Sequence, residues 1–301
     1  MKNIIHSLIK NIEKPEKPYE IDLIIDGGGF KASYIVGNLL YLKEMEKLGL
    51  IKISRISGTS VGSLLGLLYF LDELKIVYKL LPILSSKYRE NYNFSKTFDI
   101  IKFKMYNIIR EKGIDCFNNR LYINYFDMKE NKTILSNTYE NFDSIYNKIH
   151  YSCFIPFIFN GEPTLSNKID GILPFIFPKR ENTKILFLST INIRNIHSLH
   201  EILVFNDKNI SYKMLQGILD MHSFFLNKTA TMSYYIDNNS FSIFFYILFR
   251  KFLLYCIIIF IHIFNFLQRR TNLNKYILFF KKIIIILNNY YYDINYHEII
   301  Y

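Results

Sequence analysis

Apolar and polar positions in the first quarter of the chain follow two distinct patterns. Residues 21–25 form an apolar run interrupted only by Asp22, and residues 51–57 form a second run, so both predict buried β-strands. Each run ends in a glycine-containing turn. Apolar positions three or four residues apart then predict helices over 32–48 and 63–71. This repeated strand–turn–helix order predicts an α/β domain with at least two parallel strands.

Periodic apolar patterns continue beyond this first unit. Helical spacing recurs in three segments: 72–118, 143–151 and 211–235. Strand-like patterns recur in three shorter ones: 121–126, 133–136 and 184–191. Four prolines between residues 156 and 178 instead predict a long irregular connection. We therefore expect one α/β domain over residues 20–240, preceded by a short lead-in at 1–19.

The pattern changes after residue 240, where almost every position up to residue 289 is apolar or basic. Residues 252–267 are the most apolar run. As a helix, these sixteen residues would span about 24 Å, less than the ~30 Å hydrocarbon core of a bilayer. Basic residues flank the run on both sides: Arg250, Lys251, Arg269 and Arg270. Residues 241–301 therefore allow three interpretations: a membrane span, a surface anchor whose basic side chains face anionic headgroups, or buried helices that cover the sheet.

The formal net charge of +11 allows an acidic partner, either nucleic acid or anionic lipid. No nucleic-acid-binding motif accompanies the charge, so we do not expect a nucleic-acid partner. The cysteines Cys116, Cys153 and Cys256 form no CxxC pair, which fits a reducing, intracellular compartment. The N-terminal segment is too polar for a secretory signal. No cluster of histidine, cysteine and carboxylate residues predicts a metal or cofactor.

One serine stands in the pattern of an activated nucleophile. The segment Gly58-Thr59-Ser60-Val61-Gly62 connects the second predicted strand to its helix. In that context a G-x-S-x-G turn exposes a serine at the end of a sheet. The hydroxyl becomes nucleophilic only when a neighbouring base takes its proton. A glycine-rich turn whose serine merely caps the helix has the same pattern, so the pentapeptide alone leaves both interpretations open.

A run of glycines follows the first predicted strand, in Asp26-Gly27-Gly28-Gly29-Phe30-Lys31. Successive backbone N–H groups at the start of a helix bind negative charge, either a phosphate or the oxyanion of an acyl-transfer intermediate. The cation at Lys31 favours anion binding over a purely structural turn. The Rossmann pattern is not met because Ala32 stands where the last glycine would be, and the P-loop pattern is not met either.

A base for Ser60 is less obvious from the residues alone. Asp170 and Gly171 lie in the irregular connection, where an isolated aspartate is usually a turn former. His197 and His200 follow the acid, as the histidine does in a Ser–Asp–His hydrolase. Histidines in a surface loop are the commoner explanation of that pair.

Taken together, these segments resemble the patatin-like phospholipase family. The resemblance rests on four segments in the family's order: 26–31, 58–63, 152–159 and 170–171. The third, Ser152-Cys153-Phe154-Ile155-Pro156-Phe157-Ile158-Phe159, is similar to the Ser-x-x-x-Pro-x-x-Phe stretch that precedes the family's aspartate. The match covers roughly residues 20–195. It implies a three-layer α/β/α fold with a central, largely parallel sheet, here followed by a helical, apolar C-terminal extension.

The resemblance also implies a lipid acyl hydrolase of phospholipase A type, with a Ser–Asp dyad and no catalytic histidine. Ser60 would be the nucleophile and Asp170 its base. Glycine N–H groups and a nearby cation would form the oxyanion hole: Gly27, Gly28, Gly29 and Lys31. Other glycines would support the turns: Gly58, Gly62 and Gly171. A phospholipid or other acyl-lipid substrate, cleaved without metal or cofactor, makes a membrane surface the favoured partner of residues 241–301.

Three positions depart from the family pattern. Lys31 replaces the usual arginine, which keeps the charge but loses bidentate geometry. Ala32 replaces a common glycine, and Ile172 stands where a small residue often follows Asp-Gly. A catalytically weak or inactive lipid-binding scaffold is therefore an alternative, and an acyltransferase is another.

Overall fold

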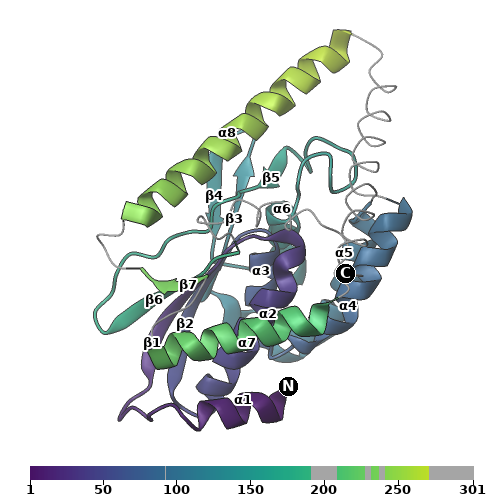
Figure 1. Cartoon of the computed structure of the whole chain (residues 1–301). Helices are drawn as coiled ribbons and strands as arrows, with labels where there is room; N and C mark the ends of the chain where they lie inside the picture. Colours follow the sequence, from purple (N-terminus) through teal and green to yellow (C-terminus); the bar gives the residue numbers. More distant parts are fainter. Residues whose placement is uncertain (92, 191–208, 228–231, 237–240, 271–301) are drawn as a thin grey trace, which may run out of the picture.

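The structure is a computed structural model that describes residues 1–91, 93–190, 209–227, 232–236 and 241–270 of the 301-residue chain (Figure 1). The helices are α1 (Lys2–Ile9), α2 (Ala32–Lys47), α3 (Val61–Leu71), α4 (Lys75–Asn91), α5 (Ser95–Lys112), α6 (Phe142–Ser152), α7 (Ile210–Asn227) and α8 (Phe241–Arg270), with short 3-10 helices η1 (Gly29–Lys31) and η2 (Asp115–Phe117). The strands are β1 (Tyr19–Ile25), β2 (Ile51–Gly58), β3 (Leu121–Asp127), β4 (Lys132–Ser136), β5 (Lys168–Asp170), β6 (Thr183–Leu188) and β7 (Ser233–Tyr235).

The strands form a seven-stranded sheet in the order β4-β3-β2-β1-β6-β7, with β5 paired to β3 off this path. The four central strands are parallel, and the pairings of β4, β5 and β7 are antiparallel. From β1, the chain places β2 on one side and β6 on the other. The carboxyl end of β1 is therefore a topological switch point, the place where open α/β sheets bind ligands.

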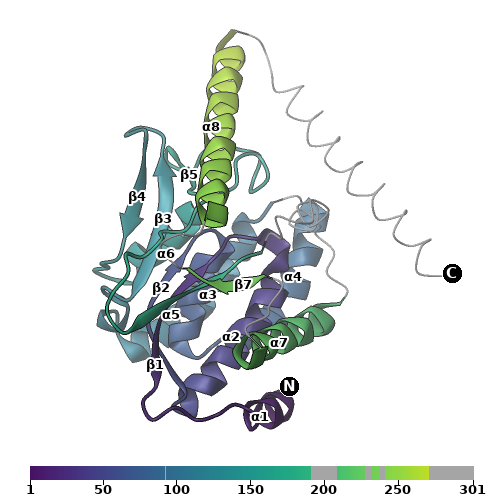
Figure 2. The same cartoon turned by 60° about the vertical axis from the view of Figure 1, so that its left-hand side comes forward.

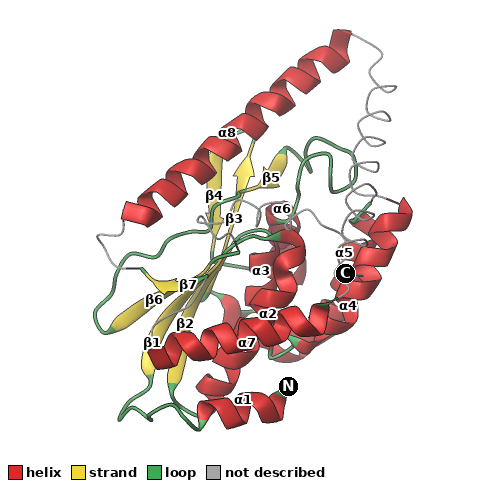
Figure 3. Ribbon diagram, in the orientation of Figure 1, coloured by secondary structure: helices red, strands yellow, loops and turns green. Residues whose placement is uncertain are grey.

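Alternate residues of β1 face two different layers of helices. Leu23 and Ile25 belong to the main core, which includes residues of α2 and α3. Ile24 instead packs in a second cluster with Phe187 and Tyr246 of α8. Because successive strand residues point to opposite faces, α8 begins on the face of the sheet opposite to α2 and α3. Figure 2 and Figure 3 show α8 standing apart from the other helices. Helices therefore lie on both faces of the central, mostly parallel sheet, and the predicted three-layer α/β/α fold class is confirmed.

The long helix α8 has a buried stripe and an exposed apolar face. The buried residues recur every three or four positions: Ile243, Tyr246, Arg250, Leu254, Ile258 and Ile261. The exposed face carries large apolar side chains at similar spacing: Phe244, Leu248, Phe252, Tyr255, Ile259 and Ile263. The segment Ile243–Gln268 has 26 residues and is, by length and composition alone, long and apolar enough to cross a membrane. The sixteen-residue estimate from the sequence was too short, because the helix includes the mixed apolar and basic residues that precede residue 252.

Most predicted elements are confirmed in the described residues, and the differences have physical causes. The helix predicted over 211–235 ends at Asn227, and Ser233–Tyr235 form the edge strand β7, because pairing with β6 outweighs local helical spacing. The connection at 156–178 contains one short strand, β5, which forms by pairing with β3 rather than through any pattern of its own.

Candidate active site

Ser60 lies in the turn between β2 and α3, at the carboxyl end of the parallel sheet. Its backbone has φ 53° and ψ −135°, a strained conformation for a residue with a side chain. Local hydrogen bonds hold the turn: the N–H of Gly62 donates to the carbonyl of Thr59 at 2.9 Å, and the hydroxyl of Ser63 donates to the carbonyl of Ser60 at 2.6 Å. This strained strand-to-helix bend is the geometry that presents a nucleophilic serine.

The turn has no room for a side chain at position 62, where Gly62 lies against β1. A Cβ atom at Gly62 would lie 2.5 Å from the carbonyl oxygen of Ile25 in β1. Only a glycine lets the first turn of α3 approach the neighbouring strand so closely. Gly58 is the last residue of β2 and Gly62 lies in the first turn of α3, so the two glycines of the G-x-S-x-G segment bracket the bend.

The glycine loop leaves β1 beside Ser60. A Cβ atom at Gly27 would lie 2.9 Å from Cβ of Ser60, so the loop and the serine are in direct contact. Within the described part of the chain, the N–H groups of Gly27 and Gly28 donate to no protein acceptor. Gly29 then begins η1, which leads directly into α2. Backbone donors at a helix start, next to a serine hydroxyl, are the arrangement that stabilises an oxyanion.

Asp170 ends β5 and is 6% exposed. Its Oδ1 atom accepts from the N–H of Ile172 at 2.8 Å and from the hydroxyl of Thr59 at 3.3 Å. Burial raises the pKa of the Asp170 carboxyl to about 6, against the opposing effects of hydrogen bonds from Ser60, Ile172 and Thr59 and of the Arg250 charge. A carboxylate with such a pKa is ionised at neutral pH and can still accept a proton readily.

The segment 152–159 positions both candidate catalytic residues. The N–H of Ser60 donates to Oγ of Ser152 at 2.9 Å, and the N–H of Asp170 donates to the carbonyl of Phe154 at 2.9 Å. The sequence singled out this segment by resemblance but assigned it no function. Its first and third residues are the ones that fix the backbones of the serine and the aspartate.

Lys31 is buried, and its Nζ atom donates to the carbonyl of Thr190 at 3.2 Å. Thr190 follows β6, so this bond ties the glycine loop to the next strand of the sheet. The hydroxyl of Thr190 reinforces the tie, because it donates to the carbonyl of Gly27 at 2.6 Å. The lysine therefore holds the loop in place, and a direct part for it in the oxyanion hole stays a prediction.

The histidine alternatives receive no support from the described residues. His6 contacts Glu44, His222 contacts the hydroxyl of Tyr41, and His150 stacks against Phe98 in an aromatic cluster. His197 and His200 lie outside the described residues. In the described part of the chain, no group of three histidine, cysteine or carboxylate side chains is placed to hold a metal ion.

Sequence reasoning missed the environment of Asp26. This carboxylate is fully buried at the end of β1 and accepts two 2.8 Å hydrogen bonds from Nη2 of Arg250 and one of 2.6 Å from the hydroxyl of Tyr246. The sequence left open whether Arg250 flanks a membrane span, faces headgroups from a surface anchor or lies in a helix that covers the sheet. For Arg250 the headgroup-facing interpretation is wrong, because this side chain is only 7% exposed and pairs with Asp26.

Comparison with known proteins agrees with this geometry. The family model described as patatin-like phospholipase matches residues 23–207, more than half of the chain, and this range contains the serine turn, the glycine loop and Asp170. A search of curated proteins found no match. The chain is therefore a member of the patatin-like phospholipase family.

Proposed function

We propose that this protein is a lipid acyl hydrolase of phospholipase A type, with Ser60 as nucleophile and Asp170 as base. The observation that carries the proposal is the convergence of three segments from different strands. The serine turn follows β2, the glycine loop follows β1, and the aspartate ends β5. The close approach of Gly27 to Ser60, and the hydrogen bond from Thr59 to Asp170, support a single site.

The mechanism follows from these placements. Asp170 accepts the proton of the Ser60 hydroxyl while the oxygen attacks the ester carbonyl carbon. The backbone N–H groups of Gly27 and Gly28 bind the resulting oxyanion. Collapse of this intermediate breaks the ester bond, and the departing alcohol takes the proton from Asp170. A water molecule, deprotonated by Asp170, then attacks the carbonyl carbon of the acyl-serine. The Ser60 oxygen leaves with the proton from Asp170, and the fatty acid is released.

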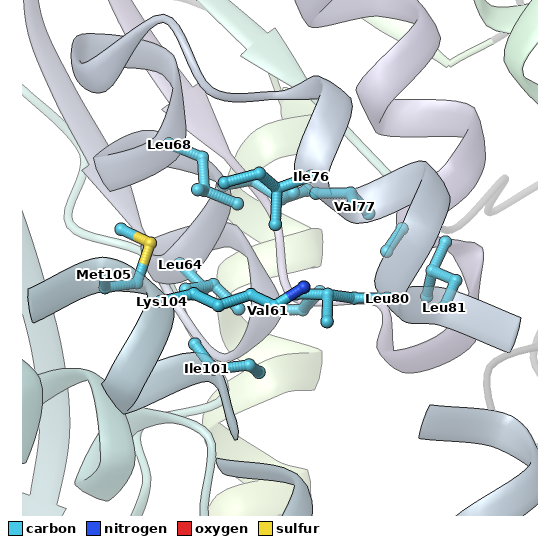
Figure 4. A pocket seen from close by; sticks show the side chains of 12 residues that line it. Val61, Leu64, Leu68, Ile76, Val77, Leu80, Leu81, Ile101, Lys104 and Met105 are labelled. Atoms are coloured by element: carbon cyan, nitrogen blue, oxygen red, sulfur yellow. The ribbon is translucent and has the colours of Figure 1, made fainter. Parts of the chain in front are cut away.

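An apolar pocket beside the serine turn supports an acyl-chain substrate. Val61, which follows Ser60, and Ala32, which follows Lys31, both line it. The other lining residues come from α3, α4 and α5 (Figure 4): Leu64, Leu65, Leu68, Ile76, Val77, Leu80, Leu81, Ile101, Lys104 and Met105. Lys104 is the only one with a polar side chain. Apolar walls next to the serine turn suit an apolar acyl group.

The exposed face of α8 supports action at a membrane surface. Phe252 is 63% exposed, and Phe244 is 60% exposed. Such a contiguous apolar face is typical of an interaction with lipid or protein. A full span is disfavoured because Arg250 and Tyr246 remain attached to Asp26 in the catalytic domain. We therefore favour α8 lying in the interfacial region of the bilayer, with its exposed face toward the acyl chains.

A fluorophosphonate probe combined with vesicle hydrolysis tests the proposal. We expect the probe to label the wild-type chain and to leave Ser60→Ala unlabelled, while the surface variant Ser7→Ala labels normally. Fatty acid should be released from mixed phospholipid vesicles by the wild type and by Ser7→Ala only. Vesicle binding without labelling would instead identify a non-catalytic lipid-binding protein. Labelling with acyl transfer to an added alcohol, and no free fatty acid, would identify an acyltransferase.

A further inference from the structure

The helix α8 reaches the candidate active site through one closed polar network. Nε of Arg250 donates to the Tyr246 hydroxyl at 3.0 Å, and both residues donate to the Asp26 carboxylate. The two residues are four positions apart and so lie on the same face of the helix. Burying a carboxylate and a guanidinium is costly unless each is paired and hydrogen-bonded, and here each is. This network therefore specifies where the start of α8 sits.

The same network extends into the glycine loop. Asp26 immediately precedes Gly27, the residue in contact with Ser60. The hydroxyl of Thr190 lies 3.2 Å from Oδ2 of Asp26 and donates to the carbonyl of Gly27. A shift of the Asp26 carboxylate would therefore move the glycine loop, which lies against Ser60. Oxyanion donors act at short range, so a displacement of less than 1 Å matters to their function.

A second contact joins α8 to the segment that positions the catalytic backbones. Phe157 packs against Phe264 and Phe260 with ring centroids 4.7 Å and 5.5 Å apart. Phe157 has φ 64°, a left-handed conformation that is rare for an aromatic residue. It belongs to the segment 152–159, which holds the N–H groups of Ser60 and Asp170. The helix thus contacts both structures that organise the site.

We propose that Arg250 and Tyr246 are positioning residues for the oxyanion hole, so that α8 is part of the catalytic unit and not a separable anchor. By fixing Asp26, they fix the end of β1 and the orientation of the Gly27 and Gly28 N–H groups. The proposal rests on the proposed hydrolase function. It also moves the functional boundary expected at residue 241 to a point beyond the start of α8.

The test compares the neutral pair variant Asp26→Asn/Arg250→Met with the wild type and with Lys251→Met. The neutral pair removes both buried charges together, which avoids leaving either one unpaired. Lys251 is the adjacent basic residue and is exposed, so Lys251→Met is the matched control. The measurements are the rate of fluorophosphonate labelling, kcat and KM for a soluble short-chain ester, and deuterium exchange of residues 26–31. Arg250→Lys, which keeps the charge but not the guanidinium geometry, provides a second variant.

We expect kcat and the labelling rate of the neutral pair to fall roughly 10- to 100-fold, with KM unchanged; this is less than the roughly 10²- to 10³-fold cost of removing an oxyanion donor, because the donors are displaced and not lost. Exchange at residues 26–31 should become faster, Arg250→Lys should retain intermediate activity, and Lys251→Met should match the wild type. Wild-type kcat in a folded neutral pair would overturn the positioning role and leave the hydrolase proposal intact. If the neutral pair does not fold, wild-type kcat in Arg250→Lys would overturn the role equally. If the wild type itself is not labelled, the proposed function fails and this inference fails with it.

Discussion

Two buried aspartates flank the candidate site, and their environments are opposite. Asp26 follows β1 and accepts hydrogen bonds from a guanidinium and a tyrosine hydroxyl, both supplied by α8. Asp170 ends β5 and accepts from one backbone N–H and from hydroxyl groups, with no cation in hydrogen-bond contact among the described residues. Similar burial therefore produces a fixed ion-pair partner in one place and a carboxylate ready to accept a proton in the other.

The difference shows which carboxylate can take part in proton transfer. A carboxylate that accepts charge-assisted hydrogen bonds from arginine is held in position, so it organises structure. A carboxylate buried mainly among uncharged groups pays a desolvation cost for its charge, which protonation relieves. The raised pKa of Asp170, at about 6, is the consequence of this second environment.

The largest expected effect comes from replacing Asp170 with asparagine, and the same replacement at Asp26 provides the comparison. Asp170→Asn should reduce kcat for a soluble ester about 10³- to 10⁴-fold, as loss of the residue that supports a nucleophilic serine commonly does. Asp26→Asn should reduce kcat less than Asp170→Asn does, and it should also reduce the free energy of unfolding by about 3–5 kcal/mol, because it leaves the Arg250 charge buried without a charged partner. Steady-state kinetics and urea denaturation of both variants measure the two effects.

Asp170→Asn should also remain fully folded. The folded-state pKa of Asp170 is raised from 3.8 to about 6, so its ionised form disfavours folding, and this cost grows as pH rises from about 4 to 6. Asparagine removes the cost, which amounts to at most about 3 kcal/mol at neutral pH. A variant that unfolds at neutral pH, or that keeps full activity, would contradict the assignment of Asp170 as the base.

The pH dependence of kcat/KM should sharpen the same comparison. Because the base must be ionised to accept the Ser60 proton, activity should rise with pH up to about 6, tenfold per unit below that value, and then level off. The profile is measured with a soluble ester at constant ionic strength. An acid limb below pH 4.5 would mean that Asp170 behaves as an ordinary exposed carboxyl, and the contrast with Asp26 would lose its functional meaning.

The smallest effect on the site is expected from a substitution on the exposed face of α8, opposite Arg250. Phe252→Glu should weaken binding to anionic vesicles by at least about tenfold, since burying one phenyl side chain contributes about 1.5–3 kcal/mol. Hydrolysis of a soluble ester should not change. Phe103→Glu on α5 is the matched control, because Phe103 is 73% exposed and lies on another helix. Equal loss of vesicle binding in both variants would exclude a dedicated surface on α8.

Local sequence patterns predicted the parts of the site that are locally determined. The bend at Ser60 contains hydrogen bonds between residues three positions apart, and the glycines of the loop are consecutive in the chain, so each turn has a recognisable local pattern even though Ser152 and Thr190 also bond to these segments. Both turns were therefore visible as motifs. Asp170 was visible only through the family resemblance, because an aspartate before a glycine in an irregular connection has no distinctive spacing.

The hydrogen bonds from Arg250 to Asp26 could not be predicted, because the two residues are 224 positions apart in the chain. In sequence, Arg250 is one of several basic residues beside an apolar run, and nothing local distinguishes it from Lys251. The available signal was weak: Tyr246 and Arg250 are four residues apart, on the stripe that also carries Leu254 and Ile258. Only the packing of α8 against the sheet shows that this stripe faces the protein.

The long separation between Asp26 and Arg250 has a consequence for synthesis of the chain. A ribosome makes β1 and the glycine loop first, and the counter-ion of Asp26 emerges only after most of the protein is complete. Until then, the Asp26 carboxylate lacks the two hydrogen bonds from Arg250 and the one from Tyr246. A nascent or prematurely terminated chain would therefore carry the serine, the aspartate and the glycines and still lack a finished hydrolase. If Arg250 positions the glycine loop as proposed, full activity would be reached only once α8 had been made.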